Sequence, residues 1–332
     1  MRKIGAWTFV SIICLILTLV FVLPATGVCA GKVYKICITQ IVTHPALDTG
    51  RKGFVDGMEA QGFKEGVNVD YIFRNAQGDM HVAASIAKYF VSIRPDLIAP
   101  ITTPCSQAVV AAAKGADIPI VFFLVTDPVA AGLVPSWTKS APYVTGVSDW
   151  ADVPTQIRYI KEIMPGVKTL GLLYNAGEVN SVVQRDELVD EVAPKLGLKV
   201  VEASAAATAD VYAAAKSLVG RVDAMWMPTD NTIFAAVDSV LKVAEEHDIP
   251  FFGSDTIQAE AGLAAAAGVD IYAIGRQASL MVGKILRGEA TAADIPPMKT
   301  KKMLFAVNPD AAKRMGLTIP QAIIDKADTV HK

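Results

Sequence analysis

Apolar residues recur along this chain at two alternating spacings. Positions 67, 69, 71 and 73 are apolar, the period-two spacing of a half-buried strand, whereas apolar positions within 82–93 recur three or four residues apart, as on one helix face. Short apolar runs then alternate with helical segments along most of the sequence. Repeated strand–helix units of this length predict parallel sheets with helices on both faces, an α/β fold.

The pattern gives residue ranges for most of these elements. We expect strands at 35–38, 67–73, 96–101, 118–124, 169–174, 199–203, 223–227 and 250–253, and helices at 50–61, 82–93, 105–114, 154–164, 181–195, 209–219 and 232–246.

The two halves of the chain carry the same order of elements. The segment 94–103 runs through a helix to 117–122, and the segment 221–230 runs through a helix of similar length to 248–252. Both copies begin with a basic residue before the strand and reach a second strand through Asp-Ile-Pro. Because order, length and turn chemistry agree, we predict two similar doubly wound parallel-sheet lobes.

The N-terminus has the order of a secretory signal peptide. Arg2 and Lys3 precede an uncharged apolar stretch, and small residues precede a cut after Ala30, so residues 1–30 are expected to be removed on export. An uncleaved membrane anchor stays open because the apolar run is long. Lipidation at Cys29 also stays open, although the bulky Val28 before it is unfavourable.

Charge and motifs narrow the function classes. With 31 basic and 33 acidic residues interleaved, the net charge is −2, which gives no one-signed patch for nucleic acid. The sequence lacks a Walker loop, a dinucleotide fingerprint and a Gly-x-Ser-x-Gly elbow, and its four histidines are scattered. We therefore predict a small-molecule binder that is not an enzyme and uses no cofactor or metal.

Polar residues gather where the predicted strands end. Ligands bind beyond the carboxyl ends of strands in open parallel sheets, so two facing lobes would line one interlobe cleft that closes by hinge motion. The candidate ligand-binding residues are Gln40, His44, Pro45, Asp48, Thr102, Thr103, Ser106, Thr126 and Asp127 in the first lobe, and Trp150, Tyr174, Asn175, Glu178, Asn180, Ser181, Thr229, Asp230, Asn231 and Asp255 in the second.

This set suits a zwitterion. Helix starts at Thr102–Thr103 and Asn180–Ser181 offer free N–H groups to a carboxylate. Glu178, Asp230 and Asp255 are candidates for an ammonium group. Two readings stay open for most of these residues, because caps are needed by any helix and aromatic residues such as Trp150 and Tyr174 often belong to the core.

Several segments resemble a known family. Residues 43–48, 75–79, 126–134, 145–149 and 228–231 are similar to ABC-transporter substrate-binding proteins of the periplasmic-binding type I fold, in the branch that includes tryptophan-binding members. The resemblance implies three interlobe crossovers, near 145–149, 264–270 and 301–307. It places residues 31–146 and about 271–300 in lobe 1, with helix 272–286 returning there, and residues 147–270 and about 301–332 in lobe 2.

The same resemblance implies a role. It suggests a monomeric periplasmic receptor that traps an amino acid, aromatic such as tryptophan, and delivers it to a membrane permease with its ATPase. An exported sensor that presents another small molecule to a membrane receptor is the alternative. A ligand-responsive regulator would need a helix-turn-helix near the N-terminus, where this chain carries the export signal instead.

Overall fold

The computed structural model describes residues 32–300 and 302–332. The expected signal peptide, residues 1–30, and its cleavage or lipidation sites lie outside this part of the chain. Within the described residues, no helix is both long and apolar enough to cross a bilayer.

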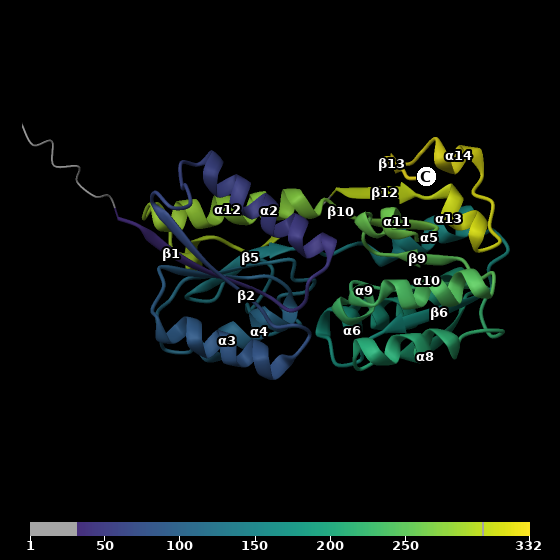
Figure 1. Ribbon diagram of the computed structural model, residues 1–332, viewed down its shortest axis with the longest axis horizontal. Helices are drawn as coiled ribbons and strands as arrows, with labels where there is room; N and C mark the ends of the chain where they lie inside the picture. Colours follow the sequence, from purple (N-terminus) through teal and green to yellow (C-terminus); the bar gives the residue numbers. More distant parts are fainter. Residues whose placement is uncertain (1–31, 301) are drawn as a thin grey trace, which may run out of the picture. The chain divides into compact units, whose positions relative to one another are not determined.

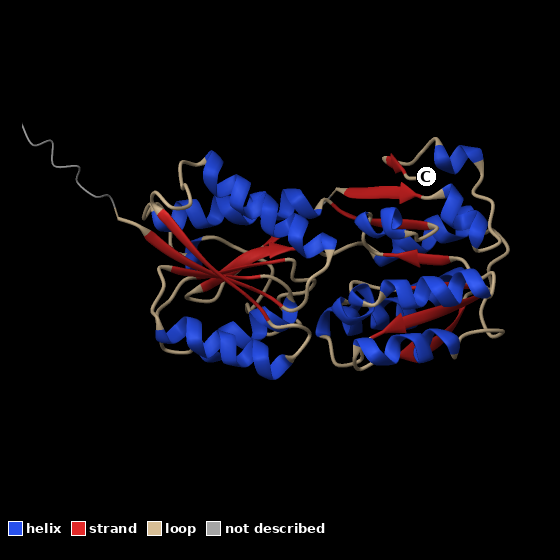
Figure 2. Ribbon diagram, viewed as in Figure 1, coloured by secondary structure: helices blue, strands red, loops and turns tan. Residues whose placement is uncertain are grey.

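The first lobe is built on a six-stranded sheet whose strands are all parallel. Its order is β11-β5-β4-β3-β1-β2. In Figure 1, α2 and α12 lie on one side of this sheet and α3 and α4 on the other, while Figure 2 shows the strands between them. The strands are β1 (Tyr34–Gln40), β2 (Val69–Asn75), β3 (Leu97–Pro100), β4 (Ile120–Phe123), β5 (Val144–Ser148) and β11 (Met298–Lys299), and the helices are α2 (Pro45–Ala60), α3 (Met80–Ser92), α4 (Thr103–Ala112) and α12 (Ile271–Leu286).

The second lobe is built on a seven-stranded sheet of order β13-β12-β10-β9-β8-β6-β7. Only the β10–β12 pair is antiparallel in this sheet. Its strands are β6 (Thr169–Tyr174), β7 (Lys199–Ser204), β8 (Ala224–Trp226), β9 (Phe251–Gly253), β10 (Ala265–Val269), β12 (Met303–Val307) and β13 (Thr329–Val330). Its helices are α5 (Val153–Ile163), α6 (Val179–Asp186), α7 (Ala193–Leu196), α8 (Val211–Lys216), α9 (Asn231–Ala235), α10 (Val237–Glu246), α11 (Ile257–Ala261), α13 (Pro309–Arg314) and α14 (Gln321–Ile324), with a π-helical turn at Glu187–Val192.

The chain passes between the lobes three times. It crosses between β5 and α5, between β10 and α12, and between β11 and β12. The predicted fold class, two doubly wound lobes joined by three crossovers, is confirmed.

Helix α12 is held against α2 by glycines. A Cβ on Gly275 would collide with the backbone oxygen of Gly50, and one on Gly53 would collide with that of Tyr272, so the two helix backbones approach more closely than larger residues allow. The Tyr272 hydroxyl also donates to Asp56 at 2.7 Å. This packing fixes α12, and with it the second crossover, to the first sheet.

Local chemistry accounts for the differences from the expected ranges. Helix α2 begins at Pro45, earlier than expected, because a first-turn proline is preset for a helix start. The helix expected over 232–246 is divided at Ala236, whose φ and ψ of −122° and 26° leave the helical region.

Cys37 and Cys105 are free and buried, so they form no bridge. Burial raises the pKa of each thiol to about 12.

Candidate functional site

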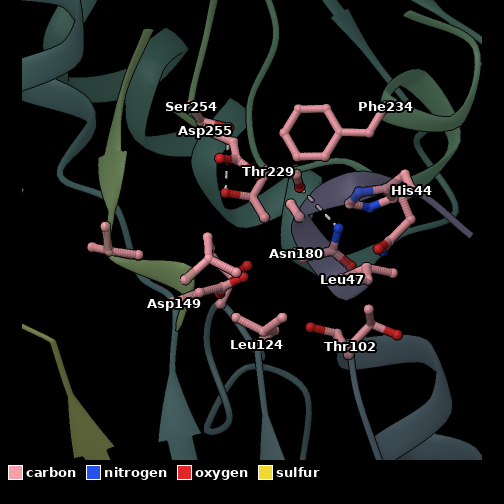
Figure 3. Close-up of a pocket in the computed structure, with 16 residues that line it drawn as sticks. His44, Leu47, Thr102, Leu124, Asp149, Asn180, Thr229, Phe234, Ser254 and Asp255 are labelled. Atoms are coloured by element: carbon pink, nitrogen blue, oxygen red, sulfur yellow. Dashed lines mark hydrogen bonds between the residues drawn. The ribbon is translucent and has the colours of Figure 1, made fainter. Parts of the chain in front are cut away.

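A pocket lies between the lobes, at the carboxyl ends of their strands. The pocket and its mouth together contain about 450 Å³ free of protein atoms. Both lobes and two crossovers contribute walls (Figure 3). The lining residues are His44, Ala46, Leu47, Thr102, Thr103, Leu124, Thr126, Asp149, Asn180, Thr229, Asn231, Phe234, Ser254, Asp255, Val269 and Ile271.

The candidate residues divide into two groups by position. The structure brings together at the pocket wall His44, Thr102, Thr103, Thr126, Asn180, Thr229, Asn231 and Asp255. The others stand behind or beside the wall: Gln40, Pro45, Asp48, Ser106, Asp127, Trp150, Tyr174, Asn175, Glu178, Ser181 and Asp230.

Helix starts supply the first-lobe wall. His44 and Thr102 are the N-cap residues of α2 and α4, and each helix has a proline in its first turn. Neither side chain caps its own helix. A side chain that does not satisfy its own helix is available to a bound molecule, and the uncapped N–H groups favour an anion.

Backbone strain is found at the same wall. Thr102 has φ 82° and Leu124 has φ 56°, both in the region that favours glycine. For a β-branched residue such as Thr102 this conformation is a genuine outlier. Strain of this kind is kept where the surrounding structure fixes it, commonly at binding sites.

Two carboxylates, Asp149 and Asp255, occupy one side of the pocket (Figure 3). Asp255 is 4% exposed; its Oδ1 accepts from the Ile257 backbone N–H at 2.9 Å. Burial, with a smaller contribution from the charge of Asp149, raises the pKa of Asp255 to about 7. Burial likewise raises the pKa of Asp149 to about 6. The pocket lining contains neither Lys nor Arg, so no lining residue neutralises this pair.

Several polar atoms of the wall have no hydrogen-bond partner among the described residues. The Thr126 hydroxyl is near Asp149 and partly opposes the rise in the pKa of that carboxyl. Its geometry does not meet the criteria for a hydrogen bond, so Thr126 Oγ1 counts among the unpartnered atoms. Buried polar groups are normally satisfied, so these atoms are available to water or to a polar ligand. These atoms are both ring nitrogens of His44, Thr102 Oγ1, Thr103 Oγ1, Thr126 Oγ1, Asp149 Oδ1 and Asn180 Oδ1.

Glu178 is also buried, but both of its carboxylate oxygens accept hydrogen bonds from the protein. Its Oε2 accepts from the Asn180 side chain at 2.9 Å and from the side chain and backbone of Asn231 at 2.6 and 3.1 Å. Its Oε1 accepts from the Thr232 hydroxyl at 2.8 Å and from the Thr232 backbone at 3.1 Å. Glu178 therefore joins α6 to the start of α9 and orients two residues of the wall.

Asp230 also uses both oxygens within the second lobe. Its Oδ1 caps α9 through the Ile233 N–H at 2.8 Å, and its Oδ2 accepts from the Asn175 N–H at 2.6 Å. Burial, reinforced by the charge of Glu178, raises the pKa of Asp230. The structure thus separates Glu178 and Asp230 from the pocket acids.

The remaining candidates have partners outside the pocket. Gln40 donates to Asp48 at 3.2 Å, and the Tyr174 hydroxyl donates to Glu202 at 2.9 Å. Trp150 lies under Lys299, whose Nζ is 4.3 Å from its ring centroid. The other partners are equally local: Asp127 caps its own turn, Ser106 Oγ donates to the Thr102 carbonyl, and Ser181 Oγ donates to the Asn175 carbonyl.

Apolar side chains complete the pocket. Phe234 meets the ring of His44 edge-on across the two lobes, with centroids 5.4 Å apart. In Figure 3, Asp149 and Asp255 are drawn on the left of the pocket, His44 on the right, and Phe234 at the top between Asp255 and His44. The wall therefore combines two acids, an aromatic pair and several hydroxyls.

Half of the residues that line the pocket are outside the candidate set predicted from the sequence. Asp149 directly follows β5, as Ser254–Asp255 follows β9, so a strand predicted at 144–148 would have identified it. Phe234 and Leu47 follow a helical apolar pattern, which carries no sign of a pocket. The lining residues outside the candidate set are Ala46, Leu47, Leu124, Asp149, Phe234, Ser254, Val269 and Ile271.

No group of three or more metal-ligating side chains occurs in the part of the chain that the structure describes.

Known proteins resemble this chain over nearly its whole length. The model of the ABC transporter substrate binding protein family matches residues 35–331. A tyrosine-binding protein of Clostridioides difficile (strain R20291) is 39% identical over 286 residues, which is 86% of this chain and 82% of that protein.

Two solved structures are similar in three dimensions. An ABC domain from Streptococcus pneumonia in complex with L-Trp has a TM-score of 0.86 at 33% identity, covering 90% of this chain and 100% of that one. A ligand-free, open substrate-binding protein from Clostridium difficile has a TM-score of 0.67 at 40% identity, with the same coverage.

Proposed function

This chain belongs to the ABC transporter substrate-binding protein family, and from that premise we propose that its interlobe pocket traps an aromatic amino acid for delivery to a membrane permease. Two relatives support this ligand class, since one is a tyrosine-binding protein and the other is a complex with L-Trp.

One observation carries the proposal: the pocket combines two buried acids with an aromatic pair, and neither Lys nor Arg lines it. The ammonium group of an amino acid would bind between Asp149 and Asp255, where a desolvated, charge-assisted contact is strong. Its apolar side chain would extend toward Phe234.

The carboxylate of the bound amino acid would lie at the start of α4. Thr102 and Thr103 present unpartnered hydroxyls at the start of α4, a ten-residue helix whose first turn contains Pro104. A helix N-terminus attracts an anion through its free N–H groups and its dipole. Neutral donors at this site suffice for one carboxylate, whose charge is balanced by the adjacent ammonium.

Closure of the lobes would bury the ligand. The higher TM-score to the L-Trp complex than to the open protein, despite the lower identity, supports a closed arrangement of the lobes in this structure. Contact of His44 with Phe234 across the cleft fits the same arrangement. We therefore propose hinge closure as the trapping step.

The location of the protein and its partners follow from this role. We propose export through residues 1–30, function in the periplasm, and docking of the closed form on a permease that works with an ATPase. We also propose that the protein acts as a monomer. Binding without turnover is expected, and recovery of unchanged ligand from purified protein would test it.

Isothermal titration of the mature chain against amino acids tests the proposal. The protein should first be unfolded and refolded to remove carried ligand. Tight binding of tyrosine or tryptophan, with no heat from alanine or glutamate, is the expected result. If a folded sample gives no binding heat with any aromatic amino acid, this ligand class is excluded, while the family and the fold are unaffected.

A further inference from the structure

His44 is held in the pocket by the backbone rather than by hydrogen bonds. It precedes Pro45, which disfavours helical geometry at the preceding residue, and it has φ −157° and ψ 159°. This extended conformation carries the ring away from the start of α2 and into the pocket (Figure 3).

The ring of His44 is buried and has no polar partner. His44 is 5% exposed, and neither Nδ1 nor Nε2 forms a hydrogen bond with any described residue. Burial, only partly opposed by the charge of Asp48, lowers the pKa of His44 to about 4, so the ring is neutral in the physiological range. A neutral imidazole offers one N–H donor and one acceptor nitrogen.

Leaving both nitrogens unsatisfied is costly, which is why buried polar groups usually find partners. Other residues of the wall suit the charged groups of the ligand. The acids Asp149 and Asp255 suit the ammonium, and Thr102 with Thr103 suits the carboxylate. His44 contacts Phe234 and is drawn across the pocket from Asp149 and Asp255, where the side chain of a ligand whose ammonium binds the acids would reach it (Figure 3).

We infer that His44 selects among aromatic amino acids by hydrogen bonding to a polar atom on the ring edge, a phenol hydroxyl or an indole N–H. This inference rests on the proposed function and adds the residue that determines specificity. Phenylalanine has no such atom, so it would leave the imidazole unsatisfied in the closed pocket. A site built to hydrogen-bond a ligand group rejects the analogue that lacks it.

Titrations of tyrosine, tryptophan and phenylalanine against wild type and His44→Phe test this inference. The variant keeps a ring against Phe234 and removes both polar nitrogens. In wild type, tyrosine or tryptophan should bind at least tenfold more tightly than phenylalanine, about 1.4 kcal/mol. In His44→Phe this preference should fall below about threefold. Whichever of the two loses its advantage identifies the ring atom that His44 contacts.

Two further variants separate selection from folding. His44→Gln restores a donor and an acceptor, so it should retain most of the preference. If His44→Phe does not fold, His44→Leu, which also removes both nitrogens, replaces it as the test. His81→Phe, an exposed histidine on α3, is the matched control and should bind all three ligands as wild type does.

Three outcomes would overturn the inference. Equal affinity of wild type for all three ligands would leave the proposed function intact but exclude selection. An equal loss for all three in His44→Phe would place His44 on the shared amino-acid backbone. Absence of binding by any aromatic amino acid would remove the proposed function and this inference together.

Discussion

Two pairs of buried acids, Glu178 with Asp230 and Asp149 with Asp255, differ in their hydrogen bonding. Glu178 and Asp230 accept bonds on both oxygens from residues of the second lobe. Asp149 and Asp255 lie on the pocket wall, where Asp149 Oδ1 has no partner among the described residues and Asp255 accepts one bond, on Oδ1.

The difference shows that burial alone does not identify a ligand-binding acid. All four carboxylates are at most 7% exposed. Only the pair with unused acceptor capacity faces the pocket, whereas the saturated pair connects α6, β6 and α9. The first pair is therefore assigned to the ligand's ammonium and the second to the stability of the wall.

The largest effect is expected from Asp255→Ala. Loss of the ammonium partner should weaken binding of tyrosine or tryptophan by at least a hundredfold, about 2.7 kcal/mol. Isothermal titration at pH 8 measures this. A variant that is folded by circular dichroism and binds with wild-type affinity would exclude Asp255 from the site.

Glu178→Gln tests the other side of the comparison. An amide nitrogen would face donors that now meet a carboxylate oxygen, so the free energy of unfolding should fall by about 2 kcal/mol. Urea denaturation measures the change. In the folded fraction, affinity should fall less than in Asp255→Ala, and a larger loss of affinity with unchanged stability would reverse the two assignments.

Affinity should also depend on pH. The ammonium favours ionised acids, while the pKa of Asp255 is about 7 and that of Asp149 about 6 in the free protein. As the pH falls through these values the acids gain protons, and the dissociation constant should rise about tenfold or more between pH 8 and 5.5. His44, with its pKa lowered to about 4, stays neutral over this range. Constant affinity from pH 8 to 5.5 would contradict the ammonium site.

The smallest predicted effect is a gain in stability. The folded-state pKa of Asp255 is raised from 3.8 to about 7, so its charge destabilises the ligand-free fold progressively as the pH rises from about 4 to 7, and the full effect is present above pH 7. Asp255→Asn keeps the acceptor for Ile257 and removes the charge, so it should raise the melting temperature at pH 8 by roughly 2–4 °C, about 1 kcal/mol. The gain should shrink at pH 5. A melting temperature below that of wild type at pH 8 would show that the charge does not destabilise the pocket.

Periodicity predicted most of the fold because it is a local property. The strand 169–174 was placed at its observed ends, and β7 and β9 within one residue. The strand Val144–Ser148 was missed because it has Thr, Gly and Ser among its five residues and follows a Gly/Pro/Ser-rich stretch. That omission concealed Asp149.

The site was predicted in part for the same reason. Strand ends and helix starts identified His44, Thr102 and Asp255 from local sequence. The structural role of Glu178 depends on Asn231 and Thr232, more than fifty residues away, so no local pattern separates it from a ligand-binding acid. The apolar part of the wall likewise depends on how the lobes face each other.

The assignment of the ammonium to Asp255 is tested most directly by pairing one change in the protein with one in the ligand. Tyrosine and its analogue lacking the amino group, 3-(4-hydroxyphenyl)propionate, should be titrated into wild type and Asp255→Asn. The wild type should prefer tyrosine by at least a hundredfold, about 2.7 kcal/mol, and the variant by less than about tenfold. The same preference in both proteins would contradict the account, because the ammonium would then bind elsewhere.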